Sequence, residues 1–162
     1  MDGERGRGGY DDLPTLLRRL KEYIAPWQNP KTALNKLRCK ILNICLDTGS
    51  KPKGIYTLTV PTGGGKTVAS LAFALRHAVA HGMKRVIYVV PYTSIIEQNA
   101  KVFREILGDG NVLEHHSGVQ LELSDGASPE EVRRALAAEN WDMPVIVTTA
   151  VQFFESIYAN RS

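Results

Sequence analysis

The chain has 162 residues, of which 43% are apolar and 23% are charged, with a formal net charge of +3. This length suits one globular domain, and the mild positive charge permits a nucleic-acid partner without arguing for one. The sequence shows no apolar run of membrane-spanning length and no cleavable signal peptide, so we expect a soluble cytoplasmic protein without a membrane partner. The two cysteines fit neither a zinc site nor a disulfide framework, which predicts reduced, partly buried thiols.

Residues 1–10 are dominated by glycine and charge and predict a flexible leader. Residues 11–53 predict two helices separated by a break at Pro26 and Pro30. Apolar residues recur at helical spacing in both. In the first, over 13–24, the expected buried side consists of Leu16, Leu17, Leu20, Tyr23 and Ile24, and in the second it consists of Leu34, Leu37, Ile41 and Cys45.

A glycine-rich loop at residues 61–67 follows a strand-like run, 54–60, and precedes a helical pattern, 68–80. Strand, glycine loop, Lys-Thr and helix form the layout that holds the phosphates of a nucleoside triphosphate. Glycines lack Cβ, so the loop can take positive φ and turn its N–H groups toward an anion. The Lys66 ammonium would reach the β- and γ-phosphates, and the Thr67 hydroxyl would bind Mg²⁺. The sequence therefore predicts a site for a nucleoside triphosphate and Mg²⁺ made by Thr62, Gly63, Gly64, Gly65, Lys66 and Thr67.

The loop departs from the general G-x-x-x-x-G-K-[ST] pattern, because Val60 stands where that pattern has its first glycine. An ordinary glycine turn before a helix is the alternative, and the flanking strand and helix disfavour it. The missing glycine points away from kinases and small GTPases. It points toward the P-T-G-x-G-K-T variant found in superfamily-two helicases.

Strands and helices alternate from residue 54 onward. Residues 85–90 and 145–148 are near-continuous apolar runs, as in strands covered on both faces, and 111–115 is a weaker strand candidate. Ser94 and Glu97 form a capping box that predicts a helix start, residues 118–127 predict a loop, and residues 128–131 form a second capping box. Repeated β-α units predict an α/β fold with a parallel sheet and helices on both faces.

Hydroxyl-bearing turns follow two of these strands, at Pro91, Thr93 and Ser94 and at Thr148 and Thr149, where Thr149 would also cap a last helix. Ligands bind at the carboxyl ends of strands in open α/β sheets, and the N–H groups of a helix start suit a nucleic-acid phosphate. Taken singly, each is equally compatible with a plain helix cap. Together with the glycine-rich loop they predict one functional edge of the sheet. His115 and His116 are adjacent on a strand and would face opposite ways, which disfavours a shared metal ion.

Four segments are similar to the helicase part of the CRISPR-associated helicase-nuclease of type I systems. They are 54–75, which contains PTGGGKT, then PYTSIIEQ at 91–98, LEHHS at 113–117 and VIVTT at 145–149. The resemblance covers most of 30–159 and implies a P-loop NTPase lobe of RecA-like fold over 54–162. It implies an ATP-dependent motor moving 3′ to 5′ on single-stranded DNA, recruited by a crRNA-guided surveillance complex, with a separate metal-dependent nuclease domain.

The resemblance also implies roles for single residues. Lys66 and Thr67 would be catalytic, with Thr67 binding Mg²⁺ alongside ATP. The DNA backbone would be contacted by Pro91, Thr93, Ser94, Thr148 and Thr149. Asn35 and Arg38 would lie beside the adenine.

The chain lacks parts that such a motor needs. No Asp-Glu-x-[His/Asp/Gln] motif occurs, and neither a second RecA-like lobe nor its arginine finger is present. We therefore expect a truncated first lobe with unpaired sheet edges, which binds nucleotide and hydrolyses ATP only together with the missing remainder. Two alternatives stay open: a non-catalytic nucleotide-binding or scaffolding remnant, and another superfamily-two motor such as a restriction translocase or an RNA helicase.

Overall fold

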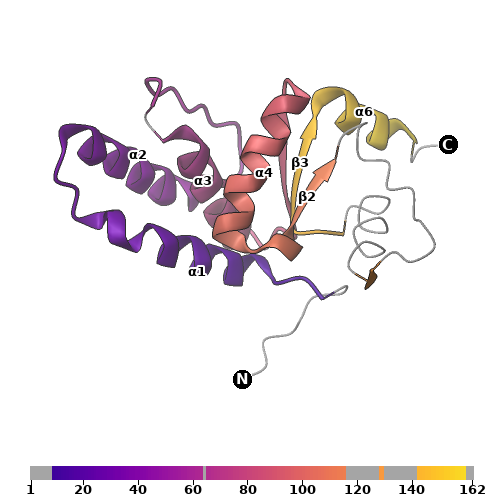
Figure 1. Ribbon diagram of the computed structural model, residues 1–162, viewed down its shortest axis with the longest axis horizontal. Helices are drawn as coiled ribbons and strands as arrows, with labels where there is room; N and C mark the ends of the chain where they lie inside the picture. The colour runs from indigo at the N-terminus through magenta and orange to yellow at the C-terminus, as the bar shows by residue number, and fades with distance from the viewer. Residues whose placement is uncertain (1–8, 64, 116–127, 130–141, 160–162) are drawn as a thin grey trace. The chain divides into compact units, whose positions relative to one another are not determined.

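The computed structural model describes residues 9–63, 65–115, 128–129 and 142–159 (Figure 1). The chain divides into two compact units. The helical unit is Asp12–Lys84, and the sheet unit combines Met1–Asp11 with Arg85–Ser162. The boundary at residue 54, expected from the sequence for the RecA-like lobe, stays a prediction.

The helical unit contains α1 (Leu13–Ile24), the short 3₁₀ helix η1 (Ala25–Gln28), α2 (Ala33–Gly49) and α3 (Lys66–Ala80). Side chains cap the first two α-helices. Asp12 accepts a hydrogen bond of 3.0 Å from the Thr15 N–H, and Thr32 accepts one of 3.2 Å from the Asn35 N–H. The predicted first helix is therefore confirmed with its predicted bounds.

Helix α3 packs against both α1 and α2. The expected apolar sides are only partly buried. Tyr23 is 38% exposed and stacks edge-on with Trp27, while Leu34 and Leu37 are 50% and 40% exposed on the first turns of α2. The prediction of their burial was wrong because helical spacing marks an apolar face but not the length over which a partner covers it.

Residues 55–60 run extended into the glycine-rich loop, but they form no strand. Leu58 and Val60 pack on a cluster of Ile41, Cys45 and Ala69, whereas Ile55 is 98% exposed. The strand predicted over 54–60 is therefore wrong for this structure. A strand is defined by its ladder of backbone hydrogen bonds, and this segment is held by side chains against α2 and α3 instead.

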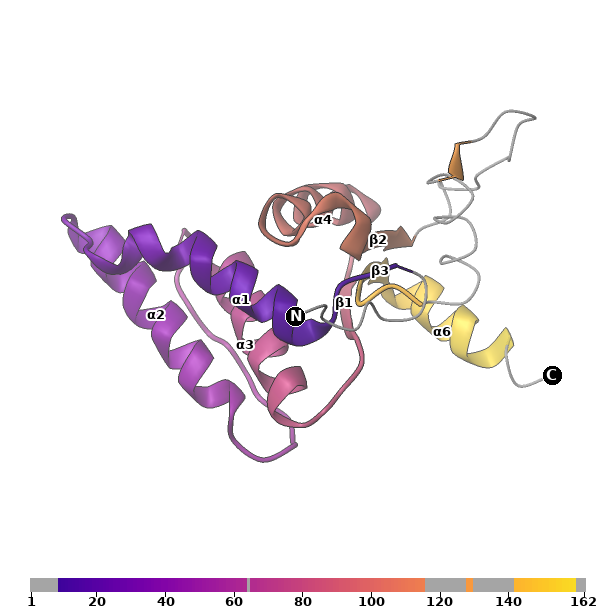
Figure 2. The same cartoon turned by 90° about the horizontal axis from the view of Figure 1, so that it is seen from below.

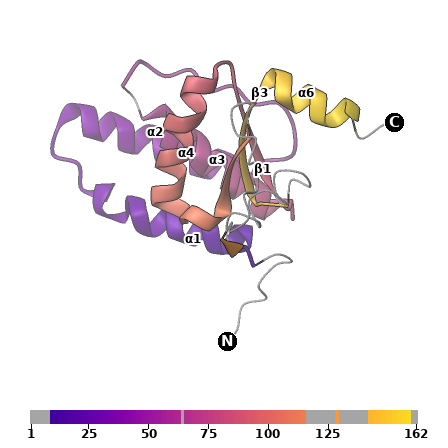
Figure 3. The same ribbon diagram turned by 45° about the vertical axis from the view of Figure 1, so that its right-hand side comes forward.

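The sheet unit contains the strands β1 (Val86–Val90), β2 (Val112–His115) and β3 (Val145–Thr149) and the helices α4 (Thr93–Leu107) and α6 (Ala150–Ala159). The strands are parallel in the order β1-β3-β2. Helices α4 and α6 lie on opposite sides of the sheet (Figure 2), and β1 runs alongside β3 (Figure 3). The predicted α/β fold with a parallel sheet and helices on both faces is thereby confirmed.

Burial differs between the strands according to their place in the sheet. All residues of the central strand β3 are buried, as predicted. Strand β1 lies at one end of the described sheet, and Ile87 and Val89 are 37% and 44% exposed. The prediction that this strand is covered on both faces was therefore wrong, since Ile87 and Val89, which share one face of the strand, remain open.

Residues near the N-terminus complete the core of the sheet unit. Tyr10, which the sequence places in the leader, is 8% exposed and packs with Leu113, Met143 and Ile146. The Asp11 N–H donates to Asn111 Oδ1 at 3.0 Å, and Asn111 Nδ2 donates back to the Asp11 carboxylate at 2.9 Å. A segment about one hundred residues distant in sequence is thus tied to the start of β2.

The expected helix caps have mixed outcomes. Helix α4 begins at Thr93 with Tyr92 as its N-cap residue and no side-chain cap, so the Ser94 capping box was wrong. Thr149 does cap α6, because its Oγ1 accepts from the Gln152 N–H at 3.3 Å. The loop predicted over 118–127 and most of the capping box at 128–131 lie outside the described residues.

Both cysteines are free and buried, whereas partial burial was predicted, and burial raises the pKa of the Cys45 thiol. Among the described residues, no group of three or more candidate metal ligands gathers. His116 is not among those residues. No described helix is both long and apolar enough to cross a membrane.

Candidate nucleotide-binding site

The glycine-rich loop has a backbone that only glycine adopts readily. Gly63 and Gly65 have φ values of +83° and +77°, in the left-handed region, and Gly64 lies outside the described residues. A Cβ at either position would strain the backbone. The two glycines turn the chain from the extended segment into α3 within a few residues.

Helix α3 presents an open N-terminus at the end of this loop. Gly65 is its N-cap residue and offers no side chain, while its carbonyl accepts the first helical bond from the Ala69 N–H at 3.1 Å. No acidic residue lies in the first turn of α3. The partial positive charge of the helix start is therefore not neutralised there, which favours an anion.

Lys66 and Thr67 begin α3 directly after the loop. Lys66 is exposed and, within the part of the chain that the structure describes, makes no ion pair. Thr67 is half-buried, and its carbonyl accepts a 3.0 Å hydrogen bond from the Ser70 hydroxyl. A residue with a cationic side chain, a residue with a hydroxyl and the helix N–H groups thus occur together at one helix start, which suits a phosphate chain with a divalent cation.

The loop is supported by α2, through a contact that the sequence did not reveal. Arg38 Nε donates to the Gly63 carbonyl at 2.8 Å, and its Nη1 donates to Asn35 Oδ1 at 3.3 Å. The resemblance placed both residues beside the adenine, whereas here Arg38 contacts the loop. No motif signals a bond between residues 25 positions apart, so only the fold could reveal it.

The two hydroxyl-bearing turns belong to the sheet unit. Val90 of β1 pairs with Thr149 of β3, so both turns lie at the carboxyl edge of adjacent strands. Pro91, Thr93 and Ser94 are exposed, whereas Thr148 is fully buried. The Thr148 hydroxyl lies 3.2 Å from His115 Nδ1, and the Thr149 hydroxyl caps α6.

The expectation that all three turns share one edge is met only in part. The glycine-rich loop belongs to the helical unit and does not follow a strand of the described sheet. Of the four threonine and serine hydroxyls predicted at the sheet edge, those of Thr93 and Ser94 belong to exposed residues, and Thr148 and Thr149 are buried. A DNA-binding role of these five residues stays a prediction.

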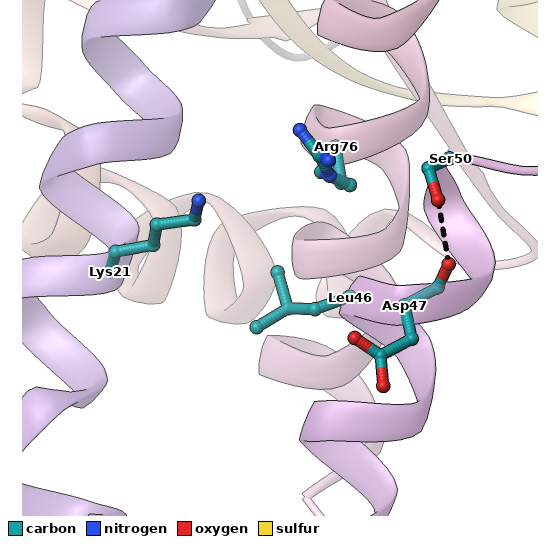
Figure 4. A pocket seen from close by; sticks show the side chains of 5 residues that line it. All are labelled: Lys21, Leu46, Asp47, Ser50 and Arg76. Carbon is teal, nitrogen blue, oxygen red and sulfur yellow. Dashed lines mark hydrogen bonds between the residues drawn. The ribbon is translucent and has the colours of Figure 1, made fainter.

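A hollow of about 370 Å³ lies elsewhere on the helical unit, lined by Lys21, Leu46, Asp47, Ser50 and Arg76 (Figure 4). Its α2 residues lie at the C-terminal end of that helix, whereas Arg38 meets the glycine-rich loop near the other end. Its charges are mixed, and none of its lining residues belongs to the loop. The hollow is therefore separate from the candidate nucleotide site.

Comparison with known proteins shows which family the chain resembles. Residues 39–162 match the DEAD/DEAH box helicase family. The chain is 31% identical to the "CRISPR-associated nuclease/helicase Cas3" of Haloferax volcanii over an alignment of 182 residues. That alignment covers 90% of this chain and 19% of the relative, so the chain spans about a fifth of the relative's length.

Proposed function

The chain belongs to the DEAD/DEAH box helicase family, and we propose that it is the ATP-binding first lobe of an ATP-dependent DNA motor acting in CRISPR interference. One observation carries the ATP-binding part. Two glycines with positive φ lead into the start of α3, which bears Lys66 and Thr67 and has no acidic residue in its first turn to neutralise the partial positive charge of the helix. The CRISPR part rests on the similarity to the Haloferax protein.

In this proposal, the N–H groups at the start of α3 and the Lys66 ammonium bind the β- and γ-phosphates of ATP. The Thr67 hydroxyl contributes a ligand to Mg²⁺, and that cation neutralises charge between the phosphates when bound. The loop glycines let the backbone approach the phosphates closely. Lys66 and Thr67 thus have the catalytic roles, while Thr62, Gly63, Gly64 and Gly65 hold the phosphate chain.

Single-stranded DNA is the proposed polymer partner, contacted by Pro91, Thr93 and Ser94 at the end of β1, while the buried Thr148 and Thr149 shape the neighbouring strand end. The exposed start of α4 suits a backbone phosphate, since its N–H groups carry no side-chain cap. A crRNA-guided surveillance complex in the cytoplasm would recruit the motor. A second RecA-like lobe and a nuclease domain would complete it.

We expect this chain to bind ATP but to turn it over negligibly by itself. The 162 residues contain no acidic motif to hold a second Mg²⁺ position or to orient the attacking water. Water positioning and an arginine finger contribute several orders of magnitude to the rate of such hydrolysis. Hydrolysis would therefore require the other parts of the motor.

Calorimetric titration of the chain with Mg-ATP tests the proposal. The wild-type chain should bind with 1:1 stoichiometry, and Lys66→Ala should weaken binding at least tenfold, since a cation on the phosphates is lost. Lys36→Ala, which removes an exposed lysine of α2, is the matched control and should bind as the wild type does. The proposal would be contradicted if the wild-type chain and the Lys66→Ala variant bound Mg-ATP with equal affinity. It would also be contradicted if the Lys66→Ala variant still hydrolysed ATP.

One observation favours a second function. Strand β1 is an outer strand of the described sheet, and its residues Ile87 and Val89 are about half exposed. An open strand of this kind is expected in a scaffolding remnant that binds a partner through the sheet edge. That function predicts a saturable complex with another protein that DNA does not strengthen. Another superfamily-two motor, such as a restriction translocase or an RNA helicase, would instead bind DNA or RNA. It would not associate with a crRNA-guided complex.

A further inference from the structure

Arg38 contacts the glycine-rich loop at two of its glycines. Its Nε–H donates to the Gly63 carbonyl at 2.8 Å. Its Cγ lies 3.7 Å from the point that a Cβ on Gly65 would occupy, so the aliphatic stem runs along the end of the loop. One side chain from α2 thus bonds the loop before α3 begins and packs beside the N-cap residue of that helix.

Asn35 fixes how the Arg38 guanidinium is turned. It lies one turn earlier on α2, and its Oδ1 accepts from Arg38 Nη1 at 3.3 Å. A guanidinium carries its donors in a rigid planar fork, so two bonds on different nitrogens define its plane. Arg38 is therefore pre-oriented toward the Gly63 carbonyl by a neighbour on the same helix.

The bond to Gly63 has a consequence for anion binding. Glycine residues with positive φ are conformationally free, so the loop needs outside contacts to keep one shape. A carbonyl oxygen turned toward a phosphate would repel it, whereas Arg38 engages the Gly63 carbonyl and holds it on the side of α2. The anchor is itself rigid, because α2 packs on α3 through Ile41, Cys45 and Ala69.

We propose that Arg38 is a positioning residue that holds the glycine-rich loop in its phosphate-binding shape, through the Gly63 carbonyl and independently of the base of the nucleotide. The inference rests on the proposed function, since it assigns a role within the same site. Pre-organisation lowers the ordering cost of binding and benefits every ligand that uses the loop. Reading of the adenine by Arg38 would instead favour adenine nucleotides alone.

The test compares Mg-ATP with magnesium tripolyphosphate, which has the phosphates but no base. Arg38→Ala should weaken both ligands by a similar factor of about ten, as expected for loss of a hydrogen bond from a charged donor. Arg38→Lys should recover only part of the affinity, because a single ammonium nitrogen does not reproduce the two separate donor positions, Nε and Nη1, of the guanidinium. Asn35→Ala should weaken both ligands in the same direction by less.

Lys40→Ala, which removes another exposed cation of α2, is the control and should leave both affinities unchanged. Unfolding midpoints without ligand show whether each variant is folded. If the Arg38→Ala variant does not fold, the affinities of the Arg38→Lys and Asn35→Ala variants decide the test. Wild-type affinity in the Arg38 variants would overturn the inference alone, and so would a loss confined to ATP. Absence of nucleotide binding by the wild-type chain would overturn the proposed function as well.

Discussion

The Asp12 carboxylate shows how one residue links local structure to pH. Its side chain caps α1, and hydrogen bonding from Thr15 holds the pKa of the carboxyl below its ordinary value, with a smaller contribution from the Arg18 charge. A lowered pKa in the folded state means that ionised Asp12 favours folding. The stabilisation is therefore complete above the unfolded pKa of about 3.9 and is lost as the pH falls through the folded value.

We predict that Asp12→Ala lowers the free energy of unfolding by about 1 kcal/mol at neutral pH, the usual cost of losing an N-cap. The difference from the wild type should shrink in urea titrations near pH 3, where the unfolded-state carboxyl is protonated. Asp12→Asn keeps a capping oxygen without the charge, so it should be more stable than Asp12→Ala by an amount that does not change with pH. A gap between wild type and Asp12→Ala that is the same at both pH values would contradict this account.

Single residues also show what the sequence could reveal. The motif predicts Gly63, Gly65, Lys66 and Thr67 because a phosphate chain imposes their types and spacing, and the structure gives the two glycines the positive φ that this geometry needs. Arg38 could not be found in the same way. Its bond to Gly63 depends on how α2 packs against α3, and nothing in the spacing of the sequence encodes that packing.

Packing between elements depends on close approach at Gly49, the last residue of α2. A Cβ at this position would lie 2.7 Å from Cβ and Cγ of Arg76 and 3.1 Å from the Phe73 carbonyl, both on α3. Those atoms lie close to the helix backbone and cannot move away unless α3 shifts. Gly49 therefore sets the distance between the C-terminal halves of α2 and α3.

We predict that Gly49→Ala lowers the free energy of unfolding by about 1–2 kcal/mol, because overpacking outweighs the better helix propensity of alanine. Gly54→Ala is the control in the same unit, since its Cβ would meet nothing closer than 4.0 Å. Urea unfolding followed by circular dichroism measures both. Equal midpoints for the two variants would show that α2 and α3 are not in close contact at Gly49.

At the scale of elements, hydrophobic periodicity predicted the type and bounds of well-packed elements correctly. It failed for segments at the edge of the sheet or outside it. The central strand β3 and helix α1 have the predicted type and bounds to within a residue, because β3 is buried at every position and α1 buries apolar residues from its first to its last turn. Strand β1 and the segment 55–60 differ from prediction because an apolar run does not state how many neighbours it will have. Pairing partners are a property of the whole sheet.

At the scale of the whole molecule, the sequence predicted the fold class, but it did not indicate that Tyr10 and Asp11 belong with the sheet unit. The chain leaves the sheet unit after Asp11, builds the helical unit, and returns at Arg85. The hydrogen bonds between Asp11 and Asn111 and the burial of Tyr10 join the start of the chain to the later part of the sheet unit. These residues are about 100 positions apart, and no local sequence pattern indicates contacts over such a separation. The proposed nucleotide loop lies in the helical unit and the proposed DNA-contacting turns lie in the sheet unit.

The central claim is that the glycine-rich loop and the start of α3 bind a triphosphate, and a crystal structure of the chain with Mg²⁺ and a non-hydrolysable ATP analogue tests it most directly. We expect the β- and γ-phosphates to accept from the N–H groups that begin α3, with the Lys66 ammonium on the phosphates and the Gly63 carbonyl still bonded to Arg38. Phosphates bound at another place on the molecule, or a loop left empty at saturating analogue, would contradict the account.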